Sequence, residues 1–189
     1  MVCRYLAEAT LATSGLAFKD LTVMPMASVL PGIQALMDGR VDAATCAAPG
    51  MPAIREADAR IGIRWLAVET SPAAIKRMRQ VFPGSFIDSL KPGEAPGLKE
   101  TISVVGYHFY LVSSTQTDEN TLYQVMKTLW DHNEELFKIN PQLKYWTHDQ
   151  AVQESVAIPY HPAAIKFFKE KGLWKPEMEK IQQDLLSGK

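Results

Sequence analysis

The sequence predicts an α/β fold, with a mainly parallel sheet and helices on its faces. Three observations lead to this prediction. Short apolar segments alternate with helix-like segments through residues 5–81, and capping or turn-forming residues separate them. The composition, 47% hydrophobic and 22% charged, is typical of a packed globular core. Such an alternation indicates βαβ units with right-handed crossovers.

Helical spacing and terminal residues locate the helices. Ser28 can cap a helix that ends at Gly39. Thr117 is expected to cap one long helix that places Asp118 and Glu119 at its positive end and extends through Phe137. The remaining helices are predicted over residues 5–14, 51–59, 72–81, 162–171 and 176–186.

Three short apolar segments are predicted to be buried strands of the parallel sheet, over residues 21–25, 41–46 and 63–68. Prolines and glycines in residues 82–99 predict an irregular excursion over the surface. Residues 101–113 form an extended apolar run, longer than the usual strand of about 5–6 residues. We expect this run to pass from one sheet to another, with Gly106 at the bend.

Charge and cysteine content exclude several classes of function. The 20 basic and 21 acidic side chains are mixed along the chain, which disfavours nucleic-acid binding. No apolar run approaches the roughly 20 residues that cross a bilayer, and the opening residues do not resemble a secretory signal, so the chain as written is expected in the cytoplasm. Cys3 and Cys46 are predicted to be small, partly buried residues, not a disulfide framework or a metal site.

Ligands of open parallel sheets bind beyond the carboxyl ends of the strands. Three loops lie there, at residues 26–28, 47–50 and 69–71. The second loop is the most suggestive, because its small residues let a ligand approach the backbone and the next helix can bind a carboxylate at its N-terminus. The alternative is that these are plain tight loops, with Ser28 as an N-cap. The predicted ligand-binding residues are Met26, Ser28, Ala47, Ala48, Gly50 and Tyr107.

Tyr107 is preferred over His108 because alternate strand residues face opposite ways and a tyrosine suits a partly polar ligand. The alternative is that Tyr107 belongs to the core. Arg4 and Arg64 are possible carboxylate partners, although solvated surface positions are the favoured interpretation for both.

Catalytic and metal chemistry have weak support in the sequence. His161 stands directly before a helix and has no evident acidic partner, and Cys46 is the only plausible nucleophile. A structural role is favoured for both residues. The four histidines lack metal-ligand spacing, and no nucleophile elbow, phosphate loop or dinucleotide fingerprint occurs, so no metal and no cofactor are expected.

Three segments together resemble the TAXI-type solute-binding receptors of TRAP transporters. They are residues 11–23, residues 32–44 and, as the most specific, residues 158–172, which contain Ile158-Pro159-Tyr160-His161-Pro162. The resemblance implies the type II periplasmic-binding fold with two lobes. Relative to the family pattern, we expect the export signal, most of the first lobe and a Gly/Ser/Thr-rich ligand turn to be absent. The family's His-Pro-Gly-Ala is here His161-Pro162-Ala163-Ala164.

The resemblance also implies a function and a domain organisation. Residues 1–100 are expected to form the second lobe, residues 101–113 the crossover, and residues 114–189 the returning part of the first lobe with the C-terminal helices. A periplasmic receptor of this kind binds a small organic acid or amino acid between its lobes and delivers it to a membrane permease, without turnover. Two alternatives stay open: the effector-sensing domain of a regulator, and a small α/β enzyme using Cys46 or His161.

Overall fold

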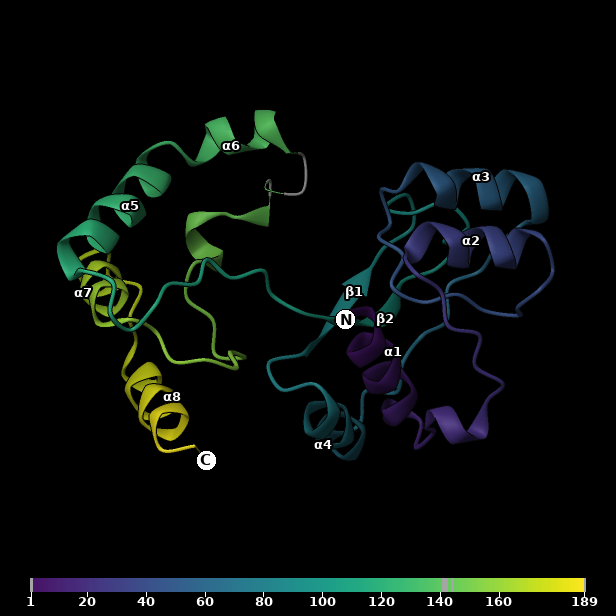
Figure 1. Cartoon of the computed structure of the whole chain (residues 1–189), viewed down its shortest axis with the longest axis horizontal. Coiled ribbons are helices and arrows are strands. Elements are labelled where there is room, and N and C mark those ends of the chain that lie inside the picture. The colour runs from purple at the N-terminus through teal and green to yellow at the C-terminus, as the bar shows by residue number, and fades with distance from the viewer. Residues whose placement is uncertain (1, 141–142, 144, 189) are drawn as a thin grey trace. The chain divides into compact units, whose positions relative to one another are not determined.

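The computed structural model describes residues 2–140, 143 and 145–188. It divides into two compact units, Met1–His108 and Phe109–Lys189. Eight α-helices and one two-stranded sheet form the main regular structure of the described residues (Figure 1). The boundary between the units falls inside the extended run of residues 101–113.

The first unit contains four α-helices close to the predicted positions. They are α1 (Val2–Thr13), α2 (Val29–Met37), α3 (Pro52–Ile61) and α4 (Pro72–Val81). A short 3-10 turn, η1 (Phe18–Asp20), follows α1. Proline is the first residue of both α3 and α4. Proline has no backbone N–H, and this costs nothing at the first helical position, because the N–H there has no acceptor within the helix.

Helix α4 has a side-chain cap at its start and is bonded to α1 through Arg77. The hydroxyl of Ser71 accepts the backbone N–H of Ala74 at 3.3 Å and so begins α4. From the middle of α4, the Arg77 guanidinium donates to the carbonyl oxygens of Ala12 and Thr13 at 2.8 and 2.5 Å. These carbonyls belong to the last turn of α1, where the helix itself supplies no donor. The Ala12 carbonyl also accepts the Gly15 N–H at 3.1 Å. The two helices are therefore held together by directed hydrogen bonds as well as by packing.

The core of the first unit lies between α2 and α3, which run side by side in Figure 1. Ile33 and Met37 from α2 meet Ile54 and Ala57 from α3. The half-buried side chains packed around these four come from both helix starts and from the segment after α3: Val29, Ala47, Met51, Ala53, Ile63 and Trp65.

The parallel sheet predicted over residues 21–25, 41–46 and 63–68 is wrong for the described residues. Their sheet consists of β1 (Phe86–Leu90) and β2 (Ile102–Gly106), which are antiparallel with Phe86 opposite Gly106. None of the three predicted strands is assigned to a sheet. Residues 63–68 contact β2 through one hydrogen bond, from the Val68 N–H to the Ser103 carbonyl at 2.9 Å. An apolar run favours an extended backbone, but a strand also needs a pairing neighbour that local sequence does not specify.

β1 lies within residues 82–99, which were expected to be irregular throughout. Its partner β2 covers only part of the predicted extended run, and Gly106 ends it instead of forming a bend between sheets. A Cβ on Gly106 would lie 2.7 Å from the Phe86 ring. Because glycine has no side chain, the Phe86 ring can lie directly against β2 at this position. Close cross-strand packing therefore explains the glycine.

The second unit contains α5 (Glu119–Asp131), α6 (Asn133–Ile139), α7 (Pro162–Glu170) and α8 (Pro176–Leu186). The single long helix predicted from Thr117 is two helices, because His132 has φ −120° and ψ 22° and leaves the helical conformation. The N-cap of α5 is Asp118, not Thr117, and its carboxylate accepts the N–H of Thr121 at 2.8 Å.

An aromatic core stabilises the second unit. Phe167 on α7 is almost fully buried and meets the edges of Tyr123 and Trp130 on α5, with ring centroids 5.5 Å apart in both pairs. Tyr160, before α7, makes edge contacts with Phe168 and Trp174. Packing of α5 against α7 thus rests mainly on rings.

Candidate functional site

A disulfide fixes the start of the loop that the sequence analysis favoured. Cys3 on α1 and Cys46 are bonded, with Cα atoms 5.3 Å apart and a sequence separation of 43. The expectation that these cysteines are unpaired is wrong. Two cysteines so far apart along the chain carry no local signal of pairing; their proximity follows only from the fold.

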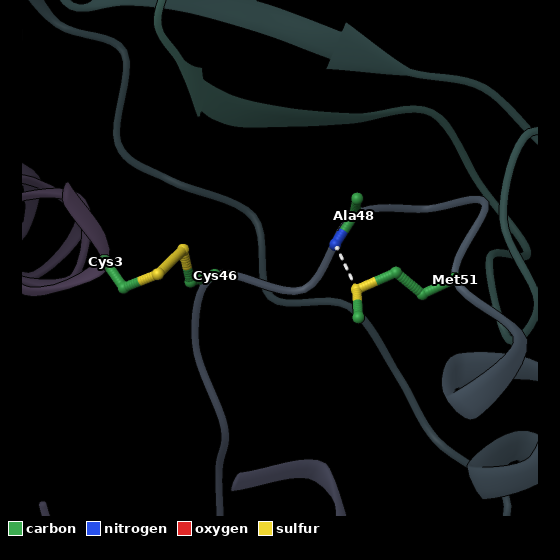
Figure 2. Close-up of a disulfide and its surroundings, with 4 residues drawn as sticks. All are labelled: Cys3, Cys46, Ala48 and Met51. Carbon is green, nitrogen blue, oxygen red and sulfur yellow. Dashed lines mark hydrogen bonds between the residues drawn. A yellow bond between two sulfur atoms is a disulfide. The ribbon is translucent and has the colours of Figure 1, made fainter. Parts of the chain in front are cut away.

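The loop after Cys46 leads directly into α3. Figure 2 shows the Met51 thioether accepting the backbone N–H of Ala48, with a nitrogen–sulfur distance of 3.4 Å. The Met51 N–H in turn donates to the Ala48 carbonyl at 3.1 Å, which closes a tight turn over residues 48–51. Ala47 and Ala48 are half-buried and Gly50 is exposed. A Cβ on Gly50 would meet nothing within 4 Å, so the loop backbone is open to approach there.

Met26 and Ser28 precede α2 in the same unit. Ser28 has the extended backbone of an N-cap, but its hydroxyl accepts no hydrogen bond from the described first turn of α2. Met26 is half-buried and Ser28 exposed. The next residue, Val29, packs against the same core as Ala47. The two loops therefore border one hydrophobic core.

Tyr107 belongs to a row of three rings that includes Tyr5 on α1. Its centroid lies 5.8 Å from that of Phe82, which lies 6.3 Å from that of Tyr5 on α1. The neighbouring His108 instead stacks on Phe86 at 4.4 Å. Burial lowers the pKa of His108 below its ordinary value of 6.5, while the charge of Asp88 opposes this shift. Tyr107 and the Cys46 loop are thus both attached to α1, the first through Phe82 and Tyr5 and the second through Cys3.

The two arginines and the third loop make local contacts. Arg4 pairs with Glu8 on α1 at 3.3 Å and lies over the Phe18 ring, and Arg64 is exposed. In the loop of residues 69–71, the Glu69 carboxylate accepts the Ser71 N–H at 3.1 Å, and Ser71 caps α4. Nothing in these contacts joins the third loop to the Cys46 loop.

The structure assigns structural roles to the two residues of the enzyme hypothesis. Cys46 has no thiol to act as a nucleophile, because it is disulfide-bonded. His161 is the N-cap of α7, and its Nδ1 accepts the Ala163 N–H at 3.2 Å. No group of three potential metal ligands occurs within the described ranges. The nucleophile of the enzyme hypothesis, the Cys46 thiol, is therefore absent from the oxidised protein.

A hollow of about 420 Å³ lies along one side of α4, lined by Pro72, Ile75, Lys76, Arg79 and Gln80. None of the predicted ligand-binding residues lines it. All five lining residues come from a single helix, and a ligand site normally needs groups that converge from several elements. We do not assign this hollow to the ligand.

Comparison with protein families places the chain in a family of the periplasmic-binding-protein-like fold group, and that family is one of binding proteins. The chain belongs to the NMT1-like family, whose model matches residues 4–172. It matches none of the curated proteins with which it was compared. In the described part of the chain, none of the helices is long and apolar enough to span a membrane.

Proposed function

We propose that this chain is a TAXI-type solute receptor that binds a small organic acid or amino acid outside the cytoplasm and delivers it to a TRAP permease. The observation that carries this proposal is the family match, because residues 4–172 include all six predicted ligand-binding residues. In this proposal the protein does not bind nucleic acid and does not insert into the membrane.

The geometry of the first unit supports a grip made mainly by backbone groups. Ala47, Ala48 and Gly50 have small or no side chains, and the space beside Gly50 is open. A ligand carboxylate can therefore approach the start of α3, where the helix carries partial positive charge. Tyr107 offers a ring and a hydroxyl for the rest of a partly polar ligand.

The disulfide supports a location outside the cytoplasm. Disulfides persist in oxidising compartments and are rare in the reducing cytosol. The Cys3–Cys46 bond thus agrees with an exported receptor and opposes the expectation of a cytoplasmic protein.

Thermal denaturation with a panel of dicarboxylates, 2-oxo acids and amino acids tests the function. We expect at least one compound to raise the midpoint of unfolding in a concentration-dependent way, because a ligand that binds only the folded state stabilises it. A flat response to the whole panel, on protein with an intact disulfide, would contradict the proposal.

A matched pair of variants locates the site. Ala48→Asp places a negative charge beside the proposed carboxylate, whereas Ala48→Asn has nearly the same shape without the charge. We expect Ala48→Asp to weaken binding of a panel hit by at least about fivefold, and Ala48→Asn to change it much less, since two like charges about 4 Å apart repel by about 1 kcal/mol even in water. Calorimetric titration measures both. Equal losses of affinity in the two variants would show that the ligand carboxylate does not bind at this loop.

A further inference from the structure

One partner of the disulfide belongs to a helix that is anchored independently. Ala7 and Ala9 of α1 are buried, and the helix packs on α4. The Arg77 guanidinium also holds the carbonyl groups of its last turn. α1 is therefore also held by contacts that do not involve Cys3.

The other partner begins a loop with few internal restraints. Within residues 46–51, the described hydrogen bonds are the turn between Met51 and Ala48 and the contact of the Ala48 N–H with the Met51 sulfur. Sulfur is a weak acceptor. Few hydrogen bonds and partial exposure are the features of segments that open locally at low free energy.

The backbone of Cys46 points to a restraint on this loop. Cys46 has φ +67° and is the one non-glycine residue in this conformation in the described part of the chain. A side chain disfavours left-handed backbone geometry, which persists where the surroundings impose it. The bond to Cys3 is the covalent restraint at this position (Figure 2).

We propose that the Cys3–Cys46 disulfide is a redox-dependent clamp that fixes the conformation of the loop over residues 46–51. The clamp joins the loop to the anchored helix α1, and its consequence for ligand binding rests on the proposed function.

Closure of the clamp is a thiol–disulfide exchange with an external disulfide such as oxidised glutathione. One cysteine thiolate attacks this disulfide, forms a mixed disulfide and releases one glutathione thiolate. The second cysteine, as its thiolate, then attacks the protein sulfur and releases the second glutathione. Two thiols of the protein lose two protons and two electrons, and one oxidised glutathione becomes two reduced molecules.

Hydrogen–deuterium exchange of the full chain tests the clamp without any ligand. Alkylation and mass measurement of the denatured, air-oxidised protein should first show no free thiol. Reduction with dithiothreitol should then accelerate amide exchange in residues 46–51 at least tenfold and lower the unfolding midpoint of the first unit by on the order of 10 °C. The double variant Cys3→Ser/Cys46→Ser should exchange rapidly with or without dithiothreitol. Helix α7, whose unit contains no cysteine, is the internal control and should not respond.

Two results would overturn the clamp: two alkylated thiols in the oxidised protein, or loop exchange that reduction leaves unchanged. The ligand panel separates this test from that of the function. A compound that stabilises the oxidised protein should bind at least about tenfold more weakly after reduction, and unchanged affinity would overturn the role of the clamp at the ligand site. If no compound binds, the receptor function fails, while the exchange data still decide whether the clamp exists.

Discussion

Arg77 joins two helices with a single side chain. Its guanidinium leaves the middle of α4 and donates two hydrogen bonds to the end of α1, at the carbonyl groups of Ala12 and Thr13. Carbonyl groups in the last turn of a helix carry partial negative charge, so a cation is favoured there. The geometry needs the planar fork of arginine, since one donor faces each carbonyl.

We expect Arg77→Ala to lower the free energy of unfolding of the first unit by about 1–3 kcal/mol, because charge-assisted hydrogen bonds and the packing of the side-chain stem are lost together. Denaturant unfolding followed by circular dichroism measures the change. Lys76→Ala, the exposed neighbour on the same helix, is the matched control and should cost less than about 0.5 kcal/mol. Similar losses in the two variants would mean that the bonds to α1 contribute nothing.

At the scale of elements, α8 is tied to the chain segment that leads into α7. The side-chain amide of Gln182 forms a reciprocal pair with the backbone of Tyr160: its oxygen accepts the Tyr160 N–H at 2.8 Å and its nitrogen donates to the Tyr160 carbonyl at 2.9 Å. Gln182 is only 8% exposed. The Tyr160 hydroxyl accepts the Gln153 N–H and donates to the Gln153 carbonyl. Tyr160 therefore joins three parts of the second unit.

Gln182→Glu is expected to destabilise the second unit by about 2–4 kcal/mol at neutral pH, because a carboxylate cannot donate to the Tyr160 carbonyl and its charge would be buried. Gln183→Glu makes the same chemical change at an exposed neighbouring position and should be nearly neutral. Thermal unfolding of the two variants measures the difference. Stability of Gln182→Glu equal to that of Gln183→Glu would contradict this account of the pair.

The elements differ in how far the sequence predicts them. Residues 72–81 were expected to be helical and form α4 at the same bounds, because Ser71, Pro72 and the helical spacing are all local signals. The strand β1 was missed, since its pairing with β2 spans residues that the local pattern does not connect. The Cys3–Cys46 bond was missed for the same reason. Ser28 and Gly50 lie in loops, as expected, but whether they bind a ligand stays a prediction.

At the scale of the whole molecule, the two units rely on different interactions. The first unit combines an aliphatic core, a small sheet and the disulfide. The second unit has neither strand nor cysteine in its described residues and relies on the aromatic packing around Phe167. Because both disulfide partners belong to the first unit, the bond does not join the two units covalently.

The segment at the unit boundary should be the first target of limited proteolysis. Residues 107–118 lie outside the helices and strands, and Phe109 and Val112 are 71% and 66% exposed. A protease must unfold several residues to bind them, so it prefers exposed segments without regular structure. Chymotrypsin, which cuts after large aromatic residues, is expected to cleave first after Phe109 or Tyr110 and to yield two fragments that separate without reductant. Phe109→Ser should slow this cut, whereas Phe137→Ser, a change within α6, should not. First cleavage inside α5 or α6, identified by the masses of the fragments, would show that the boundary lies elsewhere.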